Sequence, residues 1–284
     1  MADHPGHPGF GVLLTRLLNY RQTDIAWLAT ASDIPESELY SVADGAPPSV
    51  SHLEDLAAAL GFHTADLFVI AGLPVPEPLQ PCEPLAGSGL ARVLHITMVL
   101  PEDQRIHIRA TVEQLPHLPH VRPADPPRTP YLRYYLQDGG FGAMLVAMLC
   151  ANRNLSLPAA ARTSALLTQG RMYLSASTYH SIATGSAPLR PAWLAGFATT
   201  LGIPIGDLAA ITGTVLSEPT PPDNPLAAEA AELLWDCQRL TASQIEHVRA
   251  EAEAMLVAVP HDASNDDWHR VLHHHGTWWG TPRP

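Results

Sequence analysis

Apolar residues near the start of the chain recur at intervals of three and four positions, the period of an amphipathic helix. One such face is formed by Val12, Leu13, Leu17 and Leu18, and a second by Ile25, Leu28 and Ala29. No segment of any length alternates apolar and polar residues as a half-buried strand would. The pattern therefore predicts an all-α fold built from short helices.

Turn-forming residues divide the following positions into three more helices. Pro35 fits the start of a third helix because its φ is fixed, and Gly45 fits its end because glycine tolerates positive φ. A fourth helix is predicted over 51–60, closed by Gly61, and a fifth begins at Thr64. Five short helices in this order account for residues 10–73.

The chain repeats this segment. LAAALGFHTADLFVIAGL at 56–73 returns as FATTLGIPIGDLAAITGT at 197–214, and both copies open on the dipeptide Phe-Gly. Farther on, LPEDQRIHIRATVEQL at 100–115 resembles LTASQIEHVRAEAEAM at 240–255. Self-similarity over this length predicts an internal duplication, with two diverged copies of one helical module, each followed by a helical hairpin.

The duplication and the proline-rich stretches define the predicted domains. The apolar faces of the two hairpins are too wide for isolated helices, so they must pack on each other, on the modules or on a second chain, as in a homodimer. The predicted segments are an acidic module (10–73), a hairpin (85–116), a Pro-rich linker (117–140), a basic module (141–214), a second hairpin (226–259) and a flexible tail (260–284).

The motifs of each copy resemble those of the Cro/repressor (XRE-type) helix-turn-helix family of bacterial regulators. The resemblance rests on LATASDI before the third helix, the glycine that ends this helix, and the LAAALG helix that follows. It implies lambda-repressor-like modules whose second and third helices form the helix-turn-helix, with the third helix in the major groove of double-stranded DNA. A cytoplasmic transcriptional regulator is therefore expected, and no segment reads as a membrane span.

Charge separates the two copies. The whole chain carries a net charge of −12, which disfavours indiscriminate coating of nucleic acid. Residues 10–73 hold two arginines against eight carboxylates, whereas residues 141–214 hold four arginines against one carboxylate. The net charges are therefore −6 and +3. If one copy contacts phosphate, the second copy is expected to do so.

The third helices of the two copies differ in charge as the whole copies do: the first is acidic and the second is not. In the first copy, Glu36, Glu38 and Asp44 stand where DNA contacts are expected, so this helix is interpreted as a scaffold or protein contact, with a cytosine-reading glutamate as the alternative. In the second copy, Tyr179 and Ile182 fall on core positions. Hydroxyls and a histidine remain on its outer face, although an ordinary solvated helix has the same composition.

The candidate DNA contacts of the second copy include an expected N-cap, Ser175, and two flanking arginines suited to phosphate. They are Arg171, Ser175, Ala176, Ser177, Thr178, His180, Ser181 and Arg190. About nine extra residues separate the first and third helices of this copy and are assigned to 157–175. They predict either a longer second helix or an extra loop around Gly170, and either would change the docking angle.

Signatures of other chemistry are missing from the sequence. No Gly-rich phosphate loop, nucleophile elbow or zinc-protease helix occurs, so neither an enzyme nor a cofactor site is expected. The histidine run 273–275 with Asp266, Asp267 and His269 is interpreted as a polar tail rather than a metal site. The cysteines are far apart and are expected to be buried thiols: Cys82, Cys150 and Cys237.

Two functions remain open. One is a sequence-specific DNA-binding regulator that contacts its operator mainly through the second module, while the acidic first module recruits protein partners. The other is a helix-turn-helix descendant that no longer binds DNA and acts as a protein adaptor or sequestering factor. The positions of four arginines distinguish the two functions: Arg153, Arg162, Arg171 and Arg190. DNA binding is favoured if they line one face together with Ser177 and His180. The adaptor is favoured if they are dispersed or pair internally.

Overall fold

The computed structural model describes residues 8–84, 86–119, 140–216 and 224–257. Every regular element within these ranges is helical, which confirms the predicted all-α fold. None of the described helices combines the length and apolar character needed to cross a membrane. Most of the predicted linker and the whole predicted tail, with its histidine run, lie outside the described residues.

Residues 10–73, called module one, form five helices close to the predicted positions. The prediction for Val12 was wrong, because this side chain is 47% exposed and the buried face of the first helix instead includes Leu14. The helices are α1 (Phe10–Arg21), α2 (Ile25–Ser32), α3 (Glu36–Ala43), α4 (Val50–Leu60) and α5 (Thr64–Ile70).

Residues 141–214, called module two, follow the same order of elements. A π-helical turn, η3 (Met148–Asn152), continues the first helix of this module. The α-helices are α9 (Phe141–Ala147), α10 (Leu157–Leu167), α11 (Ala176–Ala183), α12 (Pro191–Leu201) and α13 (Ile205–Thr212).

The extra residues of module two are distributed over three places. Helix α10 has 11 residues where α2 has 8. The turn before α11 runs over 168–175, whereas the turn before α3 runs over 33–35. A residue with left-handed backbone conformation follows the first helix of each module, Gln22 in module one and Asn154 in module two. Asn154 lies one position later than the match of Gln22, because the π-helical turn η3 accommodates one more residue. Both predicted alternatives, a longer helix and a longer turn, are therefore present.

A glycine lets the first helix of each module approach the end of the third. A Cβ added to Gly11 of α1 would lie 2.3 Å from the carbonyl oxygen of Val42 in α3. A Cβ added to Gly142 of α9 would lie 2.7 Å from the carbonyl oxygen of Ile182 in α11. The Phe-Gly dipeptide that opens each copy thus has the same packing role in both modules.

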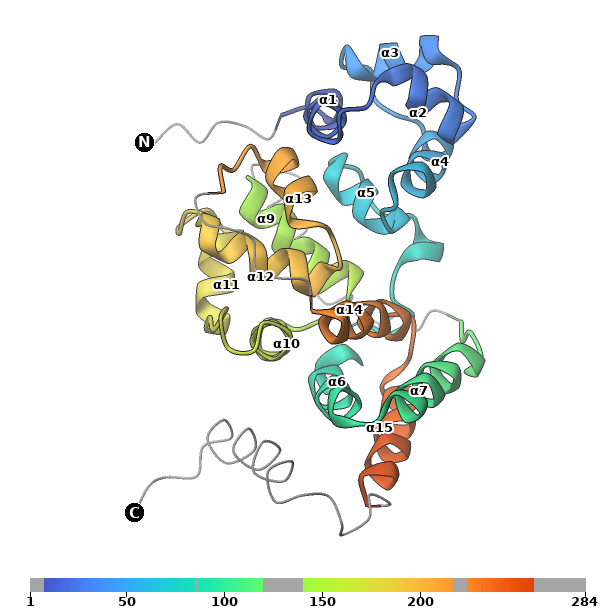
Figure 1. The fold of residues 1–284 in the computed structure, drawn as a ribbon, viewed down its shortest axis with the longest axis vertical. Coiled ribbons are helices and arrows are strands. Elements are labelled where there is room, and N and C mark those ends of the chain that lie inside the picture. The colour runs from blue at the N-terminus through green and yellow to red at the C-terminus, as the bar shows by residue number, and fades with distance from the viewer. Residues whose placement is uncertain (1–7, 85, 120–139, 217–223, 258–284) are drawn as a thin grey trace.

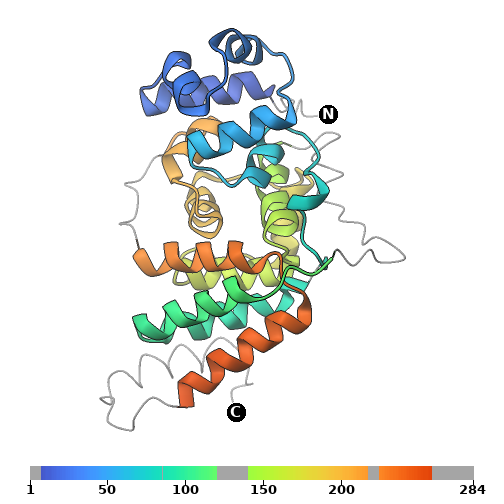
Figure 2. The ribbon, with the colours of Figure 1, turned by 90° about the vertical axis from the view of Figure 1, so that its right-hand side faces the viewer.

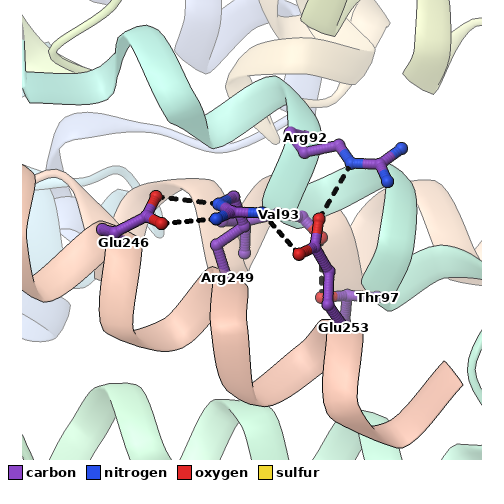
Figure 3. A network of polar contacts seen from close by, with 6 residues as sticks. All are labelled: Arg92, Val93, Thr97, Glu246, Arg249 and Glu253. Atoms are coloured by element: carbon purple, nitrogen blue, oxygen red, sulfur yellow. Dashed lines mark hydrogen bonds and ion pairs between the residues drawn. The ribbon is translucent and has the colours of Figure 1, made fainter. Parts of the chain in front are cut away.

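Two helical hairpins pack on each other and form a third unit, called the hairpin body. Its helices are connected by ion pairs between the two hairpins, such as Arg105 Nε to Glu229 at 2.8 Å. Figure 3 shows another connection, in which Glu253 of the last helix accepts from Arg92 and also pairs with Arg249. The helices are α6 (Leu90–Val99), α7 (Glu102–Gln114), α14 (Pro225–Cys237) and α15 (Ala242–Val257), with short 3-10 turns η1 (Glu77–Leu79) and η2 (Ala86–Gly89) before α6.

The three units are stacked along the long axis of the molecule. Figure 1 shows module one at the top, module two in the middle and the hairpin body below, and Figure 2 shows the same order from the side. Module one packs on module two mainly through α1 and α13, and module two packs on the hairpin body through α10 and α6. Module two is therefore enclosed on two sides, while α11 packs mainly on α9 and α10 of its own module.

Candidate nucleic-acid interface on module two

Helix α11 presents the candidate DNA-contact residues on its outer face. Ser175 is its N-cap, as predicted, and its Oγ accepts a hydrogen bond from the backbone N–H of Thr178 at 3.2 Å. This hydroxyl also lies 2.7 Å from the Oγ of Ser177, so the first turn carries a cluster of hydroxyls. Tyr179 and Ile182 are buried, as predicted, and anchor the opposite face.

The other candidates on α11 lie at the surface to different degrees. Ser177 and His180 are exposed, whereas Ala176, Thr178 and Ser181 are half-buried. Hydroxyl groups can donate to and accept from phosphate oxygens and base edges, and an imidazole can do either according to its tautomer. The outer face of α11 is therefore polar and carries no carboxylate.

Arg171 and Arg190 flank α11 in the sequence. Arg171 lies in the turn before the helix, where its Nε donates to the carbonyl oxygen of Thr168 at 3.1 Å. Arg190 is the N-cap residue of α12, and its guanidinium lies 4.9 Å from the centre of the Trp193 ring. Both side chains are exposed and oriented by these local contacts, which suits them to phosphate contacts on either side of α11.

The longer turn before α11 is fixed to the module core. Met172 is buried against α12, where a Cβ on Gly196 would lie 1.9 Å from its sulfur. The Thr168 hydroxyl accepts from the Met172 backbone N–H at 2.9 Å. This turn leaves Tyr173, which is 73% exposed, beside Arg171 in sequence. Tyr173 is not one of the residues predicted from the sequence, although its position among the extra residues could have marked it as a surface feature.

Arg153 does not belong to this surface, contrary to its treatment as one of four cations of the second copy. It is fully buried, and its two terminal nitrogens donate to the two carboxylate oxygens of Asp66 at 2.6 and 2.8 Å. One of them also donates to the Leu201 carbonyl oxygen at 2.6 Å, and Asn152 donates to Asp66. The positive charge of Arg153 is thus neutralised inside the molecule by a carboxylate of module one.

A second ion pair crosses the same interface in the opposite direction. Arg21, at the end of α1, donates to both carboxylate oxygens of Asp207 in α13, at 3.0 and 2.6 Å. Asp66 and Asp207 occupy the same position of the repeated motif, and both arginines end the first helix of their module. Each module therefore supplies one arginine to the other and receives one in return.

This exchange sharpens the difference in surface charge between the modules. With Arg153 and Asp207 paired in the interface, the exposed charges of module two are all arginines, at 162, 171 and 190. The two arginines of module one, Arg16 and Arg21, are half-buried. The exposed charges of module one are the carboxylates of Asp24, Asp33, Glu36, Glu38, Asp44, Glu54 and Asp55. The acidic third helix of module one is accordingly exposed and unsuited to a phosphate backbone.

A stacked cluster joins all three units beside the buried pair. The His63 ring of module one lies 3.8 Å from the Trp235 ring of α14, with nearly parallel planes. The Arg153 guanidinium of module two lies 4.7 Å from the same indole. Sequence reasoning did not find this cluster, because its members belong to three separate segments and meet only after folding.

The cluster predicts that stability falls on acidification. Burial first, and then the Arg153 guanidinium, lower the pKa of His63 from its usual 6.5, so the folded protein binds this proton less readily than the unfolded chain. The stabilisation is fully present above about pH 6.5 and decreases as the pH falls below that value. We expect the His63→Phe variant, which has an aromatic ring that cannot be protonated, to lose less stability on acidification in urea unfolding experiments. The same pH dependence in both proteins would contradict this.

The cysteines lie in the interior of the protein. All three cysteines are buried and unpaired with one another, as predicted, and burial raises the pKa of the Cys150 and Cys237 thiols to about 12. These two thiols stay protonated and unreactive at neutral pH. Within the described ranges, no group of histidine, cysteine and carboxylate side chains could hold a metal ion.

Comparison with protein-family models, curated proteins and solved structures found no match.

Proposed function

We propose that this protein is a bacterial DNA-binding transcriptional regulator that arose by duplication of a lambda-repressor-like helix-turn-helix module. Module two makes most of the DNA contacts, with α11 in the major groove and Arg171 and Arg190 on the adjacent phosphates. The protein acts in the cytoplasm, and a homodimer would place two copies of α11 on adjacent half-sites.

The observation that carries this proposal is the charge of the module two surface. Its exposed ionised side chains are arginines only, and two of the three flank a capped helix whose outer face is polar. Phosphate contacts supply much of the affinity of DNA-binding proteins, and hydroxyl and imidazole groups can read base edges. The equivalent surface of module one has the opposite charge, so the two modules have separate roles.

The test is enrichment of genomic DNA fragments from the source organism by the purified protein over a series of salt concentrations. We expect selective enrichment that weakens with salt, and a loss of affinity of about tenfold for each of Arg171→Ala and Arg190→Ala. The slope of the logarithm of affinity against the logarithm of salt concentration should fall in magnitude by about one for each phosphate contact that is removed. Arg92→Ala removes the same charge from the hairpin body, outside module two, and serves as the control.

A second function is favoured by the packing of α10. This helix is half of the proposed helix-turn-helix, and it lies against α6 of the hairpin body. If that contact blocks groove docking, the protein is a descendant that acts as an adaptor or sequestering factor. No enrichment of DNA even at low salt would support this function and contradict the first.

A further inference from the structure

An exposed apolar stripe runs along α2 in module one. Trp27 and Ala31 are one helical turn apart, and Trp27 is 42% exposed although it is a large aromatic residue. Ala26 and Thr30, beside them, are also exposed. Only Leu28 and Ser32 of this helix are buried, so its outer side offers apolar surface to solvent.

The corresponding stripe of module two is covered. The positions of α10 that match Trp27 and Ala31 are Ala159 and Thr163, and both are fully buried. Helix α10 packs on α6 of the hairpin body in addition to the helices of its own module. The stripe of α10 is therefore a helix-packing surface, and small residues there permit a close approach.

This comparison indicates what kind of element fits α2. Helix α6, which packs on α10, is largely apolar, with a buried face formed by Leu90, Val93, Leu94 and Thr97 together with other residues. The outer side of α2 is the corresponding surface of module one, where Trp27 and Ala31 are exposed. A large exposed tryptophan in place of alanine gives it the kind of aromatic anchor that is enriched at protein interfaces.

Charge indicates which helix would bind there. Asp24 is the N-cap of α2 and Asp33 is its C-cap, so an exposed carboxylate lies at each end of the stripe. Glu36 and Glu38 follow in α3, and the two arginines of module one are half-buried and donate to module two. An acidic helix would be repelled, whereas a helix with Lys or Arg beside its apolar face would pair with these carboxylates and place a cation near the Trp27 indole.

We propose that module one docks an amphipathic, Lys/Arg-rich helix of a partner protein on the stripe formed by Trp27 and Ala31. The inference rests on the proposed duplication, because the match between α2 and α10 defines the docking side. It deepens the recruiting role of module one and leaves DNA contact to module two. The regulator thereby binds DNA at one module and a basic protein helix at the other.

The probe is a synthetic helical peptide of about four turns with leucine and alanine on one side and lysine and arginine on the other, labelled with fluorescein. A second peptide carries glutamate in place of the basic residues. Fluorescence anisotropy with the full-length protein should show binding of the basic peptide alone. Trp27→Ala should weaken it by about thirtyfold, the effect of losing an aromatic anchor.

Two further variants separate docking from general attraction to an acidic protein. Asp24→Asn and Asp33→Asn together should weaken binding about tenfold and reduce its salt dependence. Asparagine keeps the N-cap acceptor at 24 and tolerates the left-handed conformation at 33, so the fold is preserved. Ile106→Ala removes another exposed apolar side chain, 64% exposed on α7, and should leave binding unchanged.

Three results would overturn the proposal. They are equal binding of the basic and acidic peptides, an equal loss in Trp27→Ala and Ile106→Ala, or peptide-independent self-association that Trp27→Ala abolishes, which would assign the stripe to a second copy of the chain. The DNA experiment is independent, because Trp27→Ala should enrich DNA as the unaltered protein does. Conversely, Arg171→Ala should still bind the basic peptide.

Discussion

Replacing Arg153 by methionine should lower the free energy of unfolding by about 3–5 kcal/mol, the cost of leaving one member of a buried ion pair alone. Asp66 would keep its Asn152 hydrogen bond but lose both guanidinium contacts in a site closed to solvent. The Leu201 carbonyl at the end of α12 would lose its donor as well. Urea unfolding, followed by circular dichroism, measures the change.

The matched control is Arg21→Met, at the reciprocal pair. The Arg21 side chain is 24% exposed, so water can solvate Asp207 when the arginine is removed. We expect a loss of about 1–2 kcal/mol there, which is smaller because water can reach Asp207, although it is buried beside the arginine, once Arg21 is removed. A double variant, Arg153→Met with Asp66→Leu, should recover part of the loss. Equal losses at the two arginines, or no recovery, would show that burial does not set the strength of this pair.

Most of the helices could be predicted from the sequence, because the spacing of apolar residues and the capping residues that define a helix lie within a few positions of one another. Ser175 caps α11 through a neighbour three positions away, and Tyr179 is buried because of helical spacing. Arg153 could not be placed in this way, because its partner Asp66 is distant in the chain and adjacent only in the fold. Counting charges by segment therefore treated a buried cation as part of the surface.

Signals for the missed features were nonetheless present in the sequence. Asp66 and Asp207 stand at the same point of the repeated motif, each within an otherwise apolar segment, which is typical of a carboxylate with a buried partner. The alanines of α10, such as Ala159 and Ala160, favour close packing of another helix. The identity of that helix, α6, depends on tertiary structure and has no local signature.

The exchanged ion pairs connect stability with the proposed division of labour. They hold module one to module two, and in each pair the charge of the arginine neutralises that of the aspartate. The charges that remain exposed therefore differ in sign between the modules. The acidic surface of module one would repel phosphate, and the arginines of module two would repel the basic helix proposed for module one. The proposed DNA and protein partners therefore have no common site to compete for.

Gly11→Ala should destabilise the protein by about 3 kcal/mol, although alanine is intrinsically the better helix former. The added methyl group would lie 2.3 Å from the Val42 carbonyl oxygen and 2.5 Å from that of Ala43. Both are backbone atoms, so no side-chain rotation can relieve the contact, and α1 must move away from the end of α3. The cost of separating two packed helices exceeds the gain of up to about 1 kcal/mol in helix propensity.

Gly9→Ala is the control, because its added methyl group meets nothing within 4 Å. Its effect should stay below about 1 kcal/mol, the size of an N-cap substitution. Gly142→Ala in module two should cost less than Gly11→Ala, since its methyl group would lie 2.7 Å from one carbonyl oxygen rather than 2.3 and 2.5 Å from two. It should also shift α11 and weaken DNA enrichment while Gly11→Ala does not. Equal stability of the Gly9 and Gly11 variants would show that α1 and α3 are less closely packed than the structure has them.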